Sequence, residues 1–578
     1  MKKMKKIVTL LMAGLMCFGT FSGCGKGNGD GFDENKSTLV IGYQDGGFRQ
    51  NWLDTWCEDF AEMYKDYSFE EGKTGIQFDI RPSKRLASSS AATEARDEKY
   101  HIVFNEQSNH TDFFEKIDVA RDITDIVTTP LTEFGETKTI AEKLSLDDQA
   151  FFGNNADHTE NAYTYYTLPW FEAIMGIYYD VDLFEQKGYY ISAPASEGGN
   201  PDSYGCVRSK TAKRGNGPDG KTGVIDGVDY SYDDGLPATY EEFFKMCDKI
   251  YANSQTPIIW SGHQVNYMPV LFQSVAADFD GYEQTKLKFT LDGTATNLIS
   301  VDSTTGAITR LPDQVITSET GYWLAQQEGN YQALKFFDQL INTLDPNDSL
   351  QRKYLNKDQA FGNSVTHTAA QGLFVGSKYQ DNAKTIAMIA DGSWWYNEAT
   401  SFFNMYSSIE GAGMKERKIG LMPMPKASSD RLGESTYVKC WLTNVFISKY
   451  TPDNLLEAAE LFFRYIHTDK ALSSFTRDAN GVRPFTYQQV GDDASNTSYY
   501  AKDLLRIHNT QKIVNTYSLN NVVKNNTSAM NANYTSKYGN EPQNILYKKA
   551  ATPAKIFNSF SEFLTASQWE SLYGVYYK

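Results

Sequence analysis

The fold class is decided by four short runs near the N-terminus: TLVI (38–41), WLDTWCEDFAEMY (52–64), IQFDI (76–80) and HIVF (101–104). The first, third and fourth runs have the length and the apolar or alternating pattern of strands. The second run repeats its apolar residues with the period of an amphipathic helix. Strands that alternate with helices predict an α/β fold with a mostly parallel sheet.

Polar side chains follow two of these strands. Ligands of open α/β sheets bind beyond the carboxyl ends of the strands. This rule places two groups of residues at the rim of a cleft, namely Tyr43, Gln44 and Asp45 after the first strand and Asn105, Glu106 and Gln107 after the third.

Two later helices carry their own start sequences. Thr239 and Glu242 form a capping box, in which each side chain reaches the backbone of the other. Thr451 is predicted as an N-cap that is followed by Pro452 at the first helical position. Between these elements, residues 194–236 are rich in Gly, Asp and Ser and indicate a long loop insertion.

The N-terminus resembles a bacterial lipoprotein signal. Four lysines precede an apolar run, residues 7–21, that is too short to span a bilayer, and small residues then lead to Cys24. The resemblance implies that residues 1–23 are removed and that Cys24 is acylated at the outer face of the cell membrane. Residues 24–36 then form a flexible polar tether. A plain secretory signal and an uncleaved anchor remain the alternatives.

Size and charge restrict the class of protein. The chain has 578 residues, 41% of them hydrophobic, which is enough for a two-lobed unit with a large core. Without the signal it carries 51 Lys and Arg against 72 Asp and Glu, a net charge of -21. Such an acidic surface disfavours binding to nucleic acid and polybasic docking to membranes. We expect a soluble, monomeric ectodomain.

The cysteines and histidines show no metal-binding spacing. Four cysteines remain beyond the tether, namely Cys57, Cys206, Cys247 and Cys440, and none forms a C-x-x-C pair. They are compatible with one or two disulfides or with isolated buried thiols. A catalytic zinc site has no support in the sequence.

Four further segments carry a resemblance to a known family. They are LPWFE (168–172), which runs on to Phe184, LPATYEEF (236–243), AMIADGSWW (387–395) and IGLMPMP (419–425). In this order they resemble an extracellular solute-binding protein of the sugar-binding type, which feeds an ABC transporter. Maltose-binding protein belongs to this group.

The resemblance implies a two-lobed α/β fold, the type II periplasmic-binding-protein-like fold, with mixed sheets flanked by helices and a ligand cleft between the lobes. Lobe 1 would comprise residues 37–168 and 436–490. Lobe 2 would comprise residues 169–435 and 491–578, including the insertion. The lobes of such proteins close on their ligand by hinge motion. The implied function is capture of a carbohydrate for membrane permease subunits, without catalysis.

The composition suits a sugar site, because 14% of the residues are aromatic and sugar rings stack on flat aromatic faces. The candidate platforms are Trp170, Trp260, Trp394 and Trp395. The candidate polar partners are Glu172 and Asp391, the lobe 1 residues Asn105, Glu106 and Gln107, and Arg483. Core packing for the tryptophans and surface positions for the others are the competing interpretations.

The insertion contains two motifs. GNGPDGKT (215–222) matches the P-loop pattern, but it lacks the preceding buried strand and the following helix, so nucleotide binding is not expected. Five aspartates follow each other between glycines: Asp219, Asp226, Asp229, Asp233 and Asp234. They are candidate ligands of a structural calcium ion, with a solvated acidic loop as the alternative. No other cofactor is expected.

Two other functions remain open. An extracellular glycoside hydrolase would share the export signal and the aromatic residues, and needs only two suitably placed carboxylates. A peptide-binding lipoprotein would use the same cleft. Turnover assays distinguish the first, and a ligand screen distinguishes the second.

Overall fold

The computed structural model describes residues 31–155, 159, 162–207, 212–264, 266–355, 361, 365–380, 384–526 and 533–578. The predicted signal and the predicted lipidation site Cys24 lie outside these residues. Within them, no helix combines the length and the apolar composition needed to cross a bilayer.

The first lobe is built on a four-stranded sheet in the order β19-β3-β1-β2. Strands β1 (Ser37–Tyr43), β2 (Ile76–Pro82) and β3 (Ile102–Glu106) are parallel, and β19 (Thr443–Ile447) joins β3 antiparallel. All three strands predicted near the N-terminus are therefore present. The fourth strand comes from a distant part of the chain and pairs with β3.

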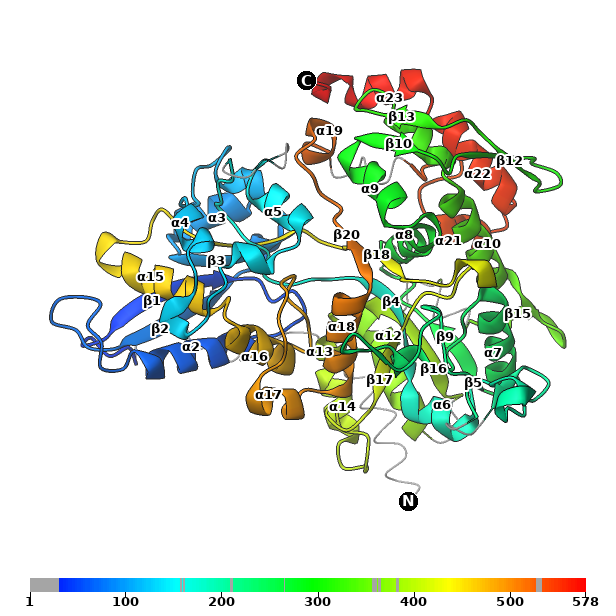
Figure 1. Ribbon diagram of the computed structural model, residues 1–578, viewed down its shortest axis with the longest axis horizontal. Helices are drawn as coiled ribbons and strands as arrows, with labels where there is room; N and C mark the ends of the chain where they lie inside the picture. The colour runs from blue at the N-terminus through cyan, green and yellow to red at the C-terminus, as the bar shows by residue number, and fades with distance from the viewer. Residues whose placement is uncertain are drawn as a thin grey trace.

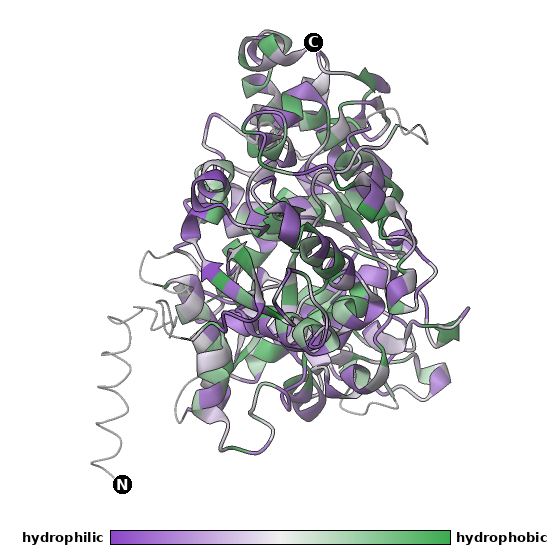
Figure 2. Ribbon diagram, turned by 90° about the vertical axis from the view of Figure 1, so that its left-hand side faces the viewer, coloured by the Kyte–Doolittle hydropathy of each residue, from purple (hydrophilic) through white to green (hydrophobic). Residues whose placement is uncertain are grey.

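Helices cover this sheet with one buried face. In α2 (Asn51–Met63) the residues Trp52, Trp56 and Phe60 are fully buried, at the spacing that the sequence predicts. Helix α15 (Asp453–Tyr465) packs on β1 and β19. Figure 2 shows the corresponding mixture of apolar and polar residues along most helices.

The second lobe is built on a mixed sheet in the order β17-β4-β16-β9. Strands β9 (Thr256–Ile259) and β16 (Ile386–Gly392) are parallel, whereas β4 (Met175–Asp180) runs antiparallel to both β16 and β17 (Ile419–Met422). The helices packed against this sheet are α7 (Tyr240–Ala252), α8 (Tyr267–Asp280), α12 (His367–Gly376) and α18 (Tyr499–Thr510). The predicted α/β fold with two helix-flanked sheets is confirmed.

The chain crosses between the two sheets several times. Leu168 pairs with Val445 and Ile174 with Lys439, so the outgoing and returning segments run antiparallel side by side. Glu172 pairs with Val482 in a further crossing. Figure 1 shows these connections between the two halves of the molecule. This is the arrangement expected of a hinge.

The C-terminal helices extend the second half. Helices α21 (Pro542–Tyr547) and α22 (Pro553–Phe563) pack on α10 (Glu328–Asn342), and α23 (Ala566–Tyr573) follows them. Figure 1 shows α22 and α23 in red at the top and upper right of the second half. The residue boundaries of the lobes stay a prediction.

The two predicted helix starts differ in outcome. Thr239 caps α7 by accepting from the backbone N–H of Glu242, and the Glu242 carboxylate accepts from the N–H of Ala238. Thr451 does not cap its helix: Pro452 is the N-cap of α15, and the Thr451 hydroxyl donates to the backbone oxygen of His101. The prediction for Thr451 is therefore wrong, because a contact with the first sheet takes its side chain.

The four cysteines described by the structure are free thiols. Cys57, Cys206 and Cys247 are buried. The sequence left disulfides and isolated thiols open, and the structure shows isolated thiols.

Candidate functional site

The two sheets meet at the carboxyl ends of β1 and β3. Because these strands are parallel, the turn after β1 lies beside the end of β3, and Gln44 N–H donates to the backbone oxygen of Phe104 at 3.1 Å. Glu106 is the last residue of β3. The rule that places ligands beyond the carboxyl ends of strands therefore points to this edge.

A glycine turn of the first lobe touches the second lobe here. Gly46 and Gly47 have φ values of +54° and +82°, which favour glycine. A Cβ on Gly47 would lie 3.0 Å from Cδ1 of Trp394 and 3.2 Å from Cγ of Glu398. A Cβ on Gly46 would lie 3.1 Å from Oε2 of Glu106. The lobes are thus in contact across the site.

Three aromatic rings gather on the second-lobe side. Trp394 follows β16 and is only 4% exposed. Its ring centroid lies 5.4 Å from that of Trp441, tilted by 42°, and 5.5 Å from that of Tyr267, edge to face. Trp441 and Tyr267 are partly exposed. Together they can form a platform for an apolar sugar face once the lobes separate.

Carboxylates surround this platform. Glu398, at the end of α13 (Trp395–Glu398), and Asp391, in β16, share one amide: Nε2 of Gln371 donates to Glu398 Oε2 at 2.8 Å and to Asp391 Oδ2 at 3.2 Å. His367 Nε2 lies 3.8 Å from Glu398 Oε1. The second lobe therefore gathers several groups beside the platform that can accept hydrogen bonds from hydroxyls.

The titration of these carboxylates is displaced. Burial raises the pKa of Glu106 to about 7, although Gln44 donates a hydrogen bond to it. Burial also raises the pKa of Glu398 to about 7, and Asp45 adds to the effect. Burial and then the charge of Glu398 raise the pKa of Asp391 well above its ordinary value. The amide donors Gln44 and Gln371 do not offset the effect of burial, so a ligand that supplies further donors would favour the charged carboxylates.

Two of the other predicted site residues support the chain crossing from the interior. Trp170 has no exposed surface, stacks on Trp52 with ring centroids 5.2 Å apart, and donates from Nε1 to the backbone oxygen of Asn105. Arg483 is also fully buried and donates to the backbone oxygens of Trp170 and Pro169.

Three more predicted residues lie in packed regions. Asn105 is fully buried, and its amide donates to Ser108 Oγ and to its neighbour's backbone oxygen. Trp260 lies against Phe361 with ring centroids 5.6 Å apart. Trp395 is fully buried among the second-lobe aromatic residues. Gln107, in contrast, is exposed beside Glu106 and remains accessible.

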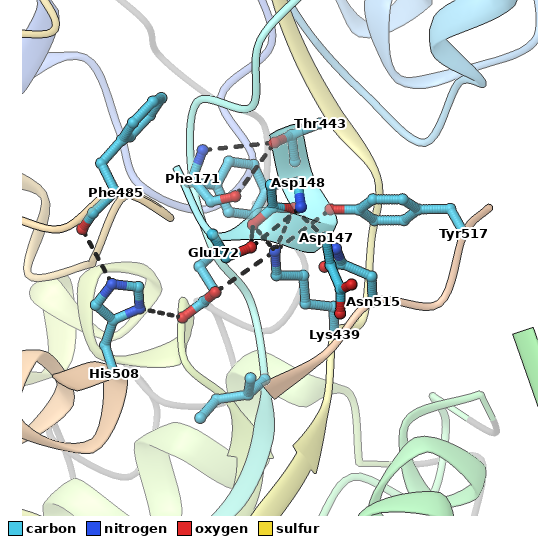
Figure 3. Close-up of polar contacts among 12 residues, drawn as sticks. Asp147, Asp148, Phe171, Glu172, Lys439, Thr443, Phe485, His508, Asn515 and Tyr517 are labelled. Carbon is cyan, nitrogen blue, oxygen red and sulfur yellow. Dashed lines mark hydrogen bonds and ion pairs between the residues drawn. The ribbon is translucent and has the colours of Figure 1, made fainter. Parts of the chain in front are cut away.

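Glu172 belongs to a network of ion pairs at the chain crossing (Figure 3). Its carboxylate accepts from Nδ1 of His508 at 2.8 Å and lies 3.7 Å from Nζ of Lys439. Lys439 also donates to Asp148 at 3.2 Å, and Asn515 Nδ2 donates to the same aspartate. Burial raises the pKa of Glu172, but His508 and Lys439 outweigh it, so its pKa lies below the ordinary value.

The sequence reasoning did not find four residues of this site: Tyr267, Gln371, Glu398 and Trp441. Glu398 follows Trp394 by four residues, the spacing of one helical face, and this was an available indication. Trp441 lies in a returning crossing segment, just before β19. Gln371 and Tyr267 belong to no sequence motif, and only the tertiary structure places them in the site.

The five aspartates of the insertion separate into two groups. Asp226 and Asp229 lie on an exposed hairpin of β7 (Val224–Ile225) and β8 (Val228–Asp229). Asp219, Asp233 and Asp234 are buried. The P-loop-like segment is followed by the hairpin and not by a helix, as expected from its sequence.

Comparisons with known proteins concern the whole chain. No family model matches the sequence, and no curated protein matches it. Solved structures do match, with low sequence identity. A chitin oligosaccharide binding protein is 14% identical, with a TM-score of 0.50, and the match covers 92% of this chain and 98% of that one.

Two further structures give the same result. A probable secreted solute-binding lipoprotein from Streptomyces coelicolor is 11% identical, with a TM-score of 0.51 over 92% of this chain and 99% of that one. Maltose-bound MalE3 of T. maritima is 12% identical, with a TM-score of 0.50 over 91% and 99%. At these identities the likeness concerns the fold. The chain has the type II periplasmic-binding-protein-like fold of the sugar-binding solute receptors, as its four sequence segments predict.

Proposed function

We propose that this protein is a membrane-anchored, extracellular receptor that captures a carbohydrate between its lobes and delivers it to an ABC transporter permease. The observation that carries the proposal is the aromatic group of Trp394, Trp441 and Tyr267 beside the buried acids Glu106 and Glu398. Sugars offer an apolar ring face and several hydroxyl donors, which match these two features.

The fold supports capture without chemistry. The neighbours with the same fold include a chitin oligosaccharide binding protein and a maltose-bound protein. In the proposed cycle, ligand enters an open form, the lobes close around it, and the permease recognises the closed form. Only a ligand with higher affinity for the closed state can drive this closure. Acylated Cys24 would keep the receptor at the outer face of the membrane.

A thermal-shift screen tests the ligand class. We expect at least one oligosaccharide from a panel of malto-, raffinose-type, xylo- and chito-oligosaccharides to raise the melting temperature, because ligand that binds the native state stabilises it. A panel of peptides serves as the comparison. Stabilisation by peptides alone would contradict the proposal and would favour a peptide-binding lipoprotein.

One observation favours a second candidate, a glycoside hydrolase. Glu106 and Glu398 have pKa values of about 7, which would suit a general acid. The discriminating experiment incubates the protein with each stabilising glycan and follows reducing ends over time. We expect no release above a buffer control. Release that disappears in Glu106→Gln and Glu398→Gln would establish the hydrolase instead.

A further inference from the structure

His508 lies between the second lobe and the chain crossing, and both of its ring nitrogens face acceptors. The residue is in the last turn of α18, which packs on β17. Its Nδ1 lies 2.8 Å from Oε1 of Glu172, and its Nε2 lies 3.0 Å from the backbone oxygen of Phe485 (Figure 3). An ionised carboxylate and a carbonyl accept hydrogen bonds and cannot donate them. Both bonds form only when both nitrogens carry a proton, so this geometry selects the positively charged imidazolium.

The charges around His508 favour the same state. Glu172 is ionised, because His508 and Lys439 outweigh the effect of burial and keep its pKa below the ordinary value. Burial lowers the pKa of His508, but Glu172 and the Phe485 carbonyl outweigh burial and Lys439, so this pKa is raised above its ordinary value of 6.5. The ring therefore stays charged at a higher pH than an ordinary histidine.

Other titratable side chains that face this pair keep their charge near neutral pH. Burial lowers the pKa of Lys439, but Asp148 and Tyr517 outweigh it, and the pKa is raised. Burial raises the pKa of Tyr487 to about 12 and also raises that of Tyr517. The lysine therefore stays positive and the tyrosines stay neutral. A change of pH through neutrality acts on this network through His508.

The network runs across the hinge from one half of the molecule to the other. Glu172 is on the outgoing crossing segment and Lys439 on the returning one. Lys439 also donates to Asp148 of α5 (Leu146–Phe152) at 3.2 Å. Figure 1 shows α5 among the helices of the first half. The contacts therefore connect α5 to α18, which packs on the second sheet, through the segments about which the lobes would turn.

A second contact holds α5 against the other half. Asp147, the neighbour of Asp148 in the chain, accepts from Nζ of Lys286 at 2.6 Å and from the hydroxyl of Tyr282. Both donors are on α9 (Tyr282–Thr290), which packs on α8 of the second lobe. Helix α5 is thus tied to the second half at two places. A hinge motion between the halves has to change these contacts.

We propose that the charge on His508 controls the hinge of the receptor: the imidazolium holds the lobes in contact, and the neutral ring allows them to separate. A neutral ring has one N–H, so either Glu172 or the Phe485 carbonyl loses its donor. Hydrogen bonds to an ionised partner are roughly twice as strong as neutral ones, so loss of the ring's charge weakens the link at the hinge. The inference rests on the proposed function, because it concerns how tightly a captured sugar is held. Capture is favoured at mildly acidic pH and release at alkaline pH.

X-ray scattering from the purified, ligand-free protein at pH 6 and pH 9 tests this control of the hinge. We expect a larger radius of gyration at pH 9, because the lobes separate when His508 loses its charge. The sugar found by the thermal-shift screen should bind about fivefold or more weakly at pH 9 than at pH 6, as expected for a typical coupling between two sites.

Two variants separate control of the hinge from a merely structural role. His508→Gln removes the titrating group, so its radius of gyration should be the same at both pH values and equal to that of the unmodified protein at pH 9. Glu172→Gln is the second variant, in case the first does not fold. It removes the charge that raises the pKa of His508, so NMR of isotope-labelled histidine rings should show this ring titrating at a lower pH.

His263→Gln is the matched control, because His263 is exposed. It should expand with pH as the unmodified protein does. Glu398 of the candidate site also titrates near pH 7, so Glu398→Gln is compared as well. If the expansion is lost in Glu398→Gln and kept in His508→Gln, the acids of the site control closure and the inference is overturned.

The inference is also overturned if the unmodified protein has the same radius of gyration at both pH values. A failure to bind any sugar at any pH contradicts the proposed function instead. Scattering from the ligand-free protein still decides the inference in that case, so the two failures are distinguishable.

Discussion

Two groups of acids in this molecule differ in whether the chain places cations beside them. At the chain crossing, Asp148 and Glu172 share Lys439, and Glu172 also pairs with His508. In the candidate site, burial raises the pKa values of Glu106 and Glu398 to about 7. The pKa of Glu172 lies below its ordinary value, although this side chain is about as buried as that of Glu106.

The difference shows how to distinguish a structural acid from a functional one. A carboxylate that holds the crossing segments together has cations supplied by the chain itself. The carboxylates of the candidate site have amide donors, but burial outweighs these donors and keeps the pKa values raised, at a cost to stability. The following experiments break or sharpen this contrast, beginning with the largest expected effect.

Removal of the shared lysine should be the most damaging change. Lys439 is 3% exposed, and Lys439→Met leaves Asp148 and Glu172 buried without their common cation. We expect a loss of about 3–5 kcal/mol of unfolding free energy, measured by urea unfolding at pH 7. Lys449→Met, which removes a surface pair with Asp118, should cost less than about 0.5 kcal/mol. Equal losses in the two variants would refute a structural role for the network.

Trp394→Ala tests the aromatic platform. For the glycan identified by the screen, we expect affinity to fall at least tenfold, which is about 1.4 kcal/mol, because the stacking face is lost. Trp260→Phe is the control, since Trp260 packs inside the second lobe. It should lower the melting temperature and leave affinity unchanged. Unaltered binding by Trp394→Ala would remove this residue from the site.

Glu106→Gln tests the unpaired acids through pH. An acid with a raised pKa in the folded state gives stability that is full below its unfolded pKa of about 4.5. This stability is lost as the pH rises through about 7, the folded value. Glu106→Gln should therefore be more stable than the unmodified protein at pH 8, by about 1–3 kcal/mol, and no more stable at pH 4.5.

The matched control for this pH series is Glu62→Gln. Glu62 lies on the surface, where its side chain is 74% exposed. It should follow the unmodified protein at both pH values. If Glu106→Gln follows the unmodified protein as well, the carboxyl of Glu106 is not strained by burial, and the contrast between the two groups fails.

His508→Gln should produce the smallest effect of these variants. In contrast to Glu106→Gln, it removes a group that is paired with a carboxylate. Burial lowers the pKa of His508, but Glu172 outweighs it and the net pKa is raised. Stability from this pair is full below about pH 6.5 and is lost as the pH rises through the raised value. Because Lys439 remains beside Glu172, we expect a cost of about 1.5 kcal/mol at pH 6, the lower end of the range for a hydrogen bond to a charged group, and a smaller cost at pH 9. His263→Gln, at an exposed position, should cost the same at both.

The fold could be predicted from the sequence because its strands are short apolar or alternating runs, and β3, β4 and β16 are buried along their whole length. The strand ends were accurate to one or two residues for β1, β2 and β3. The site was harder to predict. All five residues of β3 are buried, so no alternation distinguishes Asn105, which faces the interior, from Glu106, whose carboxylate lies beside the turn at Gly46.

The tryptophans show the same limit. Trp170 and Trp394 both follow an apolar run, and only their partners separate them, since Trp170 stacks on Trp52 inside the first lobe. Glu398 ends a helix of four residues, so its spacing from Trp394 is a single helical turn and not a repeated pattern. Side-chain direction at the junction of two lobes depends on residues hundreds of positions apart, which local sequence does not encode.

The turn at Gly46 and Gly47 has a kinetic consequence. Its bare backbone rests against Trp394, so a sugar ring can reach that indole only after the turn has withdrawn. We expect the rate of capture to level off as the sugar concentration rises. The limiting rate is that at which the lobes of the ligand-free protein separate. A larger residue at position 47 would hold the lobes apart. It should therefore shorten the delay before capture and lower the affinity for sugar.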